Sequence, residues 1–105
     1  MANLQVLNAA AVALHRAGHV PVIGVNMALP MIEAAGGGDD AYREIMMPVS
    51  LSLADRCDAC LRVGGPSKGA DDEVARFTAA GRPVYRSLSE VPGVLGARGS
   101  GAATC

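Results

Sequence analysis

Hydrophobic residues follow two alternating patterns along the chain. Over residues 4–17 they recur every three or four positions, with Leu4, Leu7, Ala11 and Leu14 on one side, which predicts an amphipathic helix that ends at Gly18. Residues 20–25 form a short, nearly continuous run rich in β-branched side chains. Such a run is typical of a strand that is buried on both faces of a parallel sheet.

The same two patterns repeat through the rest of the chain. We predict helices over residues 28–35, 42–56 and 70–80, strands over 59–63 and 83–88, and loops over 36–40 and 64–69. Pro48 should kink its helix or lie in the first turn of it. Val74 and Phe77 should face inward from the last helix.

The order helix, strand, helix, strand, helix, strand indicates an α/β domain with an open parallel sheet and flanking helices. Residues 1–91 are expected to form this single domain. Residues 92–105 are rich in Gly and Ala and are expected to form a flexible tail. Three parallel strands make a thin sheet, and because the first predicted element is a helix, we expect that a leading strand is missing.

Length, composition and charge narrow the classes of function. A chain of 105 residues is one small domain, and with half of its residues hydrophobic it can bury a core. It has one Phe, two Tyr and no Trp, which argues against base-stacking platforms for single-stranded nucleic acid. Its net charge of −1 gives no electrostatic basis for binding nucleic acid or an anionic membrane. We find no signal peptide or membrane span, so we expect a cytoplasmic protein whose partner is a small molecule or another copy of the chain.

The spacing of cysteines and histidines raises the question of a metal site. Cys57 and Cys60 form a C-x-x-C pair, and His15 and His19 are spaced like a second pair of ligands. Redox-active pairs of this kind lie where a strand enters a helix, whereas this pair lies where a helix ends and a strand begins. We therefore expect buried structural thiols, no metal and no cofactor, with both histidines at the solvent or at an interface.

The loop at residues 64–69 and the helix after it carry the most chemistry. In an open α/β sheet, ligands bind beyond the carboxyl ends of the strands, and both this loop and Asn26 reach that edge. Ser67 offers a hydroxyl, Lys68 a positive charge, and Gly69 and Ala70 the backbone amides of a helix N-terminus. This combination suits a phosphate or a carboxylate, although the spacing differs from that of a nucleotide-hydrolase P-loop.

Glu73 lies one turn inside the same helix. One interpretation is that Asp71, Asp72 and Glu73 stabilise the helix dipole, as acidic residues in a first turn do. The alternative is that the Glu73 carboxylate points toward the sheet edge, where it would serve as a nucleophile or a base.

Several short motifs, taken in order, resemble the nucleoside 2-deoxyribosyltransferase superfamily. They are a helix ending in Asp58-Ala59, a strand, the turn Pro66-Ser67-Lys68-Gly69, the glutamate Glu73 six residues after the serine, and then Gly81-Arg82-Pro83-Val84. The segment from Ala10-Ala11 to Pro21-Val22 is similar to the family's first helix and second strand. The resemblance covers residues 4–88, and the family's first strand is missing from it.

The resemblance implies a flavodoxin-like or Rossmann-like domain that cleaves or transfers the N-glycosidic bond of a nucleoside or nucleoside 5′-monophosphate. It implies that Glu73 attacks the anomeric carbon, while Ser67 and the amides after it hold the 5′-hydroxyl or 5′-phosphate. Relatives often carry an acidic residue, which supports acid/base chemistry at the base, where this chain has Ser50. The alternative is therefore a non-catalytic nucleotide-binding domain or an oligomeric structural relative.

The missing strand also bears on self-association. It would be central in the family's sheet, between the strands at residues 20–25 and 59–63. Two exposed strand edges invite pairing with another chain, so we expect a homo-oligomer, with strands or helices exchanged between copies. Met46-Met47-Pro48 is a candidate contact, and ordinary core packing of these methionines is an equal alternative.

Overall fold

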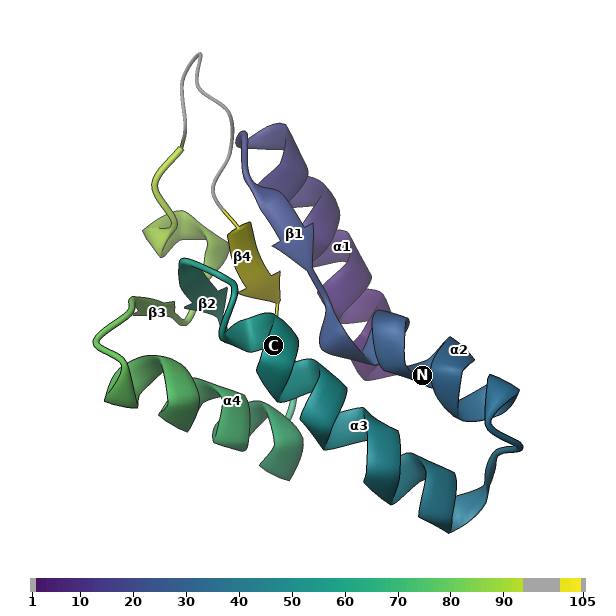
Figure 1. Ribbon diagram of the computed structural model, residues 1–105. Coiled ribbons are helices and arrows are strands. Elements are labelled where there is room, and N and C mark those ends of the chain that lie inside the picture. The colour runs from purple at the N-terminus through teal and green to yellow at the C-terminus, as the bar shows by residue number, and fades with distance from the viewer. Residues whose placement is uncertain (1, 94–100, 105) are drawn as a thin grey trace.

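The computed structural model describes residues 2–93 and 101–104 (Figure 1). These residues form a mixed α/β domain with a small parallel sheet. The helices are α1 (Ala2–Arg16), α2 (Gly24–Ala34), α3 (Gly38–Ala54), α4 (Lys68–Ala79) and the 3₁₀ helix η1 (Leu88–Glu90), and the strands are β1 (Val20–Val22), β2 (Ala59–Leu61), β3 (Val84–Tyr85) and β4 (Gly101–Thr104). Within the described residues, no helix is long and apolar enough to cross a membrane.

The C-terminal strand β4 lies inside the sheet, in the order β1-β4-β2-β3. Residues 101–103 pair in parallel with β1, and residues 102–104 pair in parallel with β2. The expected tail over residues 92–105 is therefore wrong for 101–104, while 94–100 and 105 lie outside the described residues. The hydrogen bonds between strands join backbone groups alone, so a Gly/Ala-rich segment can form a strand between two others. β4 occupies the central place in which the sequence predicted a missing strand.

The sheet divides the core into two parts, as Cys60 and Leu61 of β2 show, because consecutive strand residues point to opposite faces. Cys60 packs with the fully buried Phe77 under α3 and α4, and Val74 packs beside them, which confirms the predicted inward face of α4. Leu61 packs with Leu14 of α1 on the other face. Helices therefore cover both faces of the sheet, as the parallel pattern predicted.

A run of three glycines joins α2 to α3. Gly36, Gly37 and Gly38 have φ values of 99°, 71° and 84°, a region that residues with side chains avoid. The chain therefore reverses within a few residues. As a result α3 begins at Gly38, and the predicted loop over residues 36–40 is shorter than expected.

The helices α2 and α3 pack against each other around Ala28, Ile32, Ala41 and Met46, with Val25 beside this cluster (Figure 1). The predicted strand over residues 20–25 consequently ends at Val22, because the residues after it belong to α2 and cover α3. Met46 is buried in this cluster, as the alternative of ordinary core packing predicted. Met47 is half-buried and Pro48 is exposed, so a contact between copies through these two residues stays a prediction.

Pro48 lies inside α3 and not in its first turn, which excludes one of its two predicted places. Proline lacks the N–H that would bond to the carbonyl of Glu44. Both Pro48 and Glu44 are exposed, so water can take the place of this hydrogen bond. The helix therefore continues through the proline on its solvent side.

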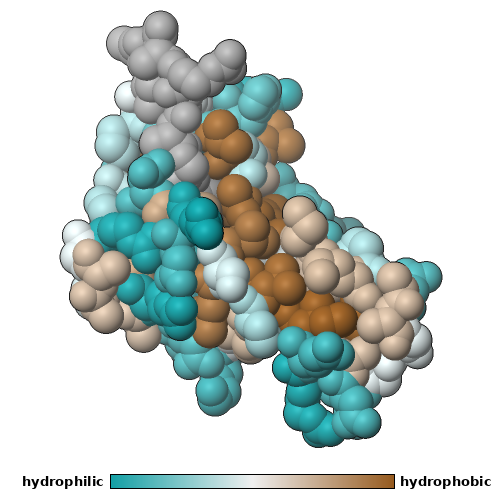
Figure 2. Space-filling view, viewed as in Figure 1, coloured by the Kyte–Doolittle hydropathy of each residue, from teal (hydrophilic) through white to brown (hydrophobic). Residues whose placement is uncertain are grey.

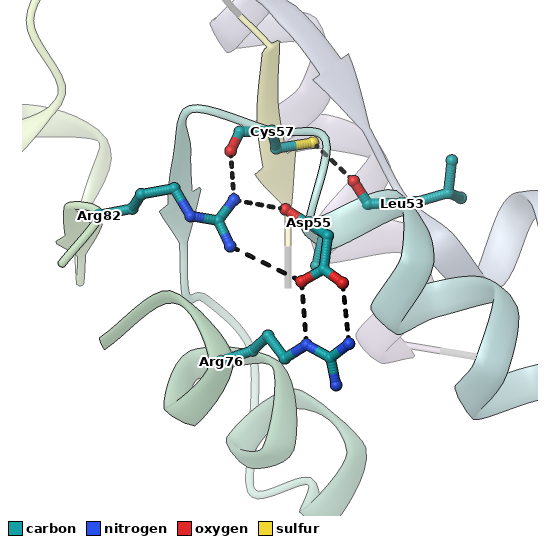
Figure 3. Close-up of polar contacts among 6 residues, drawn as sticks. Leu53, Asp55, Cys57, Arg76 and Arg82 are labelled. Carbon is teal, nitrogen blue, oxygen red and sulfur yellow. Dashed lines mark hydrogen bonds and ion pairs between the residues drawn. The ribbon is translucent and has the colours of Figure 1, made fainter. Parts of the chain in front are cut away.

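A polar cluster joins the end of α3 to α4 and to the turn before β3 (Figure 3). Asp55, at the C-cap of α3, accepts two hydrogen bonds from the guanidinium of Arg76 on α4. Arg82 donates to the backbone carbonyl of Ala54, the last residue of α3, and to that of Cys57, which follows the helix. The cluster thus fixes α3 against α4, the two helices that form most of the cavity described below.

Hydrophobic side chains run across one face of the molecule, from the region of β1 toward α2 and α3 (Figure 2). Val20 on β1 is 49% exposed, and Met27 and Met31, one turn apart on α2, are 54% and 44% exposed. The inner edges of β1 and β2 are both paired with β4, so they no longer argue for a homo-oligomer. Self-association remains a prediction.

Candidate functional site

A cavity of about 590 Å³, counting the open space at its mouth, lies at the carboxyl edge of the sheet. β1 ends at Val22 and leads directly to Ile23 and Gly24 in the cavity wall, and β2 leads through the 64–66 loop to Ser67. Open α/β sheets bind ligands at this edge.

Four of the six predicted site residues line this cavity, namely Ser67, Gly69, Ala70 and Glu73. Ser67 is the N-cap of α4, and its Oγ accepts a hydrogen bond from the amide of Ala70 at 3.2 Å. The Ser67 hydroxyl still has its own hydrogen to donate to a ligand. Glu73 is half-buried and is the only carboxylate among the described lining residues.

Lys68 and Asn26 do not belong to the cavity wall, which corrects their predicted place in the site. The ammonium of Lys68 lies 3.1 Å from the carboxylate of Asp72, one turn later on α4, and 89% of the lysine side chain is exposed. Asn26 donates a hydrogen bond from its side-chain amide to Asn8 of α1 at 2.8 Å. Each side chain thus meets a polar partner outside the cavity. For Lys68 the partner is the residue that i, i+4 helical spacing offers, whereas for Asn26 it lies on another helix, which the spacing in the sequence could not show.

Ser50 and Gly24 both line the cavity and lie against each other. A Cβ atom on Gly24 would lie 2.6 Å from the Ser50 Oγ, so the start of α2 can approach α3 only because residue 24 has no side chain. Ser50 is 3% exposed, and its hydroxyl contacts the Met46 sulfur at 4.0 Å, a weak acceptor. The position that the resemblance indicates for an acidic residue is therefore part of the cavity, with a hydroxyl in place of a carboxylate.

Sequence reasoning missed the apolar walls. Tyr42, Met46 and Met47 of α3 and Leu7 of α1 line the cavity. The helical period identified α1 and most of α3 as amphipathic, but it cannot tell whether an apolar side chain faces a cavity or the packed core. The Met47 sulfur lies 3.3 Å from the place of a Cβ on Gly69, so the flexible end of this methionine packs against the start of α4.

Two helix N-termini give the cavity its electrostatic character. α2 begins with Gly24 and Val25, and the first turn of α4 contains Gly69 and Ala70, and all four residues line the cavity. The first amides of a helix have no partner within it and carry partial positive charge. The amide of Ala70 already donates to the Ser67 Oγ. There is no Lys or Arg among the lining residues that the structure describes, so the other amides of these two helix starts are the positive groups that an anionic or hydroxyl-bearing ligand would meet.

Cys57 and Cys60 are both buried as thiols, as the interpretation as structural thiols predicted. Burial, with a smaller contribution from the charge of Asp58, raises the pKa of the Cys57 thiol. The Cys57 Sγ donates to the carbonyl of Leu53 at 3.3 Å. Among the described residues, no group of three or more His, Cys, Asp or Glu is placed to hold a metal ion.

The two histidines differ in their surroundings. His15 is exposed at the end of α1, as predicted. His19 is only 8% exposed, which corrects the expectation that it faces solvent or an interface. Its Nε2 lies 2.7 Å from the carbonyl oxygen of Pro92, and because a carbonyl can only accept, Nε2 is the donor. The hydrogen bond ties the turn before β1 to the segment after η1.

Comparisons with models of protein families, with curated proteins and with solved structures gave no match for this chain. Conclusions about its function therefore depend on the residues of the cavity and on their chemistry.

Proposed function

We propose that the cavity binds a 2′-deoxynucleoside or its 5′-monophosphate and that Glu73 opens the N-glycosidic bond, as the resemblance to nucleoside 2-deoxyribosyltransferases implies. The supporting observation is that Ser67, Gly69, Ala70 and Glu73, which the motif spacing singled out, all line one cavity. The sheet order is compatible with a flavodoxin-like fold, in which the first strand lies between the second and the third. In this chain β4 would take the place of that first strand.

Glu73 would act as the nucleophile. Its carboxylate attacks the anomeric carbon as the bond to the base breaks, which forms a glycosyl ester. Water or a second base then attacks the same carbon and releases the carboxylate. The Ser67 hydroxyl and the amide of Gly69 would hold the 5′-hydroxyl or 5′-phosphate, as a helix N-terminus can, while the amide of Ala70 donates to the Ser67 Oγ and orients it.

The leaving base needs a proton, and this need defines the alternative function. Glu73 is the only carboxylate among the described lining residues, so the proton would come from water or from a hydroxyl such as those of Tyr42 and Ser50. A hydroxyl is a weaker acid than the carboxyl group that inverting and retaining glycosidases use for this step. Ser50 therefore favours, as the second candidate, a domain that binds the nucleotide without turnover.

The test is to incubate the protein with a panel of 2′-deoxynucleosides and their 5′-monophosphates and to follow the free base by chromatography. Glu73→Gln keeps the size of the side chain and removes its charge. Glu44→Gln, at an exposed position on α3, is the matched control. Base release that the Glu44→Gln variant retains and the Glu73→Gln variant loses would support glycosidic chemistry at Glu73.

Equilibrium binding of the same panel distinguishes the two candidates. Binding without base release, retained in the Glu73→Gln variant, would favour the non-catalytic domain. Base release that persists in the Glu73→Gln variant would refute the role of Glu73. The absence of both binding and release across the panel would refute both candidates.

A further inference from the structure

Arg62 follows β2 directly, and only 9% of its side chain is exposed. Its guanidinium donates from Nη1 to the carbonyl of Val63 at 2.5 Å and from Nη2 to the carbonyl of Gly65 at 2.7 Å. Its Nε lies 3.9 Å from the carboxylate of Asp71 in the first turn of α4. The buried guanidinium of Arg62 thus contacts both the loop that follows β2 and the first turn of α4.

These contacts determine the shape of the loop between β2 and α4. Gly64 has a φ of 90°, so the chain turns sharply between the two carbonyls that Arg62 binds. A planar guanidinium with five donors can bind two carbonyls and a carboxylate at once, which an ammonium on a flexible stem cannot do in the same geometry. Ser67 lies two residues after Gly65, so the position of its hydroxyl depends on this part of the loop.

We infer that Arg62 is a positioning residue, which holds the 63–66 segment so that Ser67 and the first amides of α4 face the cavity. Arg62 itself is outside the cavity wall, so it acts through the loop. Its effect on a ligand rests on the proposed function, whereas its effect on the loop does not.

The first test measures the loop without any ligand. Arg62→Met keeps the aliphatic stem and removes every donor of the guanidinium. Trypsin cleaves after Lys68, next to the loop, and after Arg56, which lies before β2. Mass spectrometry separates the two cuts. We expect the Arg62→Met change to raise the rate of cleavage after Lys68 by at least about tenfold relative to cleavage after Arg56, because the loop opens locally.

The matched control is Arg43→Met, which removes an exposed arginine that pairs with Asp40 on α3. It should leave the ratio of the two cleavage rates unchanged. An unchanged ratio in the Arg62→Met variant, or equal acceleration at both sites, would overturn the inference, because it would mean that Arg62 does not hold the loop specifically. If Arg62→Met does not fold, Arg62→Lys takes its place, and the same ratio decides.

The second test uses whichever 2′-deoxynucleoside or monophosphate the panel identifies as a ligand. Arg62→Met should weaken its binding, or raise KM more than it lowers kcat, because the loop places binding groups and leaves Glu73 in its helix. Unchanged binding together with faster cleavage after Lys68 would refute the link between loop and ligand. If the panel yields no ligand, the proposed function fails while the cleavage ratio still decides whether Arg62 holds the loop.

Discussion

Arg76 and Asp55 are 21 residues apart in the chain and are joined by two parallel hydrogen bonds, from Nε to Oδ1 at 2.9 Å and from Nη2 to Oδ2 at 2.8 Å (Figure 3). This bidentate pair connects the C-cap of α3 to α4. Arg82 lies on the other side of the same carboxylate, at 3.8 Å. The pair thus links the two helices that form most of the cavity wall.

The first prediction concerns the pH dependence of stability at Asp55. The hydrogen bonds from Arg76 lower the pKa of the Asp55 carboxyl in the folded chain. A lowered pKa means that the stabilisation is complete above the unfolded value of about 4 and is lost as the pH falls through the folded value. The difference in unfolding free energy between the wild type and Asp55→Asn should therefore be constant near neutrality and shrink below about pH 4.

Denaturant unfolding followed by circular dichroism at a series of pH values measures this difference. Arg76→Met should remove most of the same pH-dependent stabilisation. The loss of unfolding free energy in the double variant should therefore be smaller than the sum of the losses in the two single variants. A difference that stays constant down to about pH 2 would show that the pair does not contribute through ionised Asp55.

The second prediction concerns the close approach of Gly24 and Ser50. Alanine is favoured over glycine inside a helix by about 1 kcal/mol, so Gly24→Ala would stabilise α2 if there were room. The 2.6 Å approach to the Ser50 Oγ predicts the opposite sign, a loss of about 1–3 kcal/mol from overpacking. Adding Ser50→Gly should recover part of the loss.

Gly69→Ala is the matched control, because its new Cβ would meet only the flexible end of Met47, at 3.3 Å, and the serine cap, at 3.9 Å. It should be nearly neutral in the same unfolding experiment. A Gly24→Ala variant that is more stable than the wild type would contradict the packing of α2 on α3 at this point.

The third prediction concerns the reactivity of the buried thiols. Burial raises the pKa of Cys57 and removes it from solvent, and the thiolate is the form that reacts. In a Cys105→Ser chain, we expect iodoacetamide to modify neither Cys57 nor Cys60 at neutral pH until denaturant unfolds the protein. Mass spectrometry of the intact chain counts the modified thiols. Rapid alkylation under native conditions would contradict the buried placement of the two thiols.

The fourth prediction concerns the central place of β4. β4 runs parallel to β1, so it ends at the carboxyl edge of the sheet. The first half of α1 lies at the same edge, since Leu7 lines the cavity there. A permuted chain that starts at residue 94 and joins Cys105 to Met1 through a short Gly/Ser linker should therefore keep the fold. Its unfolding free energy should lie within about 2 kcal/mol of the parent.

Deletion of residues 94–105 tests the same point in the opposite direction. Without β4, the inner edges of β1 and β2 lose their common neighbour, and cooperative unfolding should be lost or strongly weakened. A deleted chain as stable as the full chain would show that β4 does not hold the sheet together.

The sequence by itself determined the features that depend on local pattern. The period of apolar residues identified α1 and the inward face of α4, and the β-branched run identified β1. The start of a helix at Gly69 and Ala70, with Glu73 further along the same helix, also follows from the local pattern of a glycine-rich loop before an amphipathic segment. These predictions succeeded because their causes lie within about ten residues of chain.

Tertiary structure decided what depends on distant partners. Composition could not identify residues 101–104 as a strand, because the two strands that pair with them lie about 40 and 80 residues earlier. The hydrogen bonds of this pairing also involve backbone groups and not side chains, so they leave no pattern in the sequence. Asn26 lies outside the cavity wall and bonds to Asn8, 18 residues earlier on another helix. Ser50 entered the cavity because Gly24 lets α2 approach α3. In each case the deciding contact is between side chains or strands whose proximity only the folded chain creates.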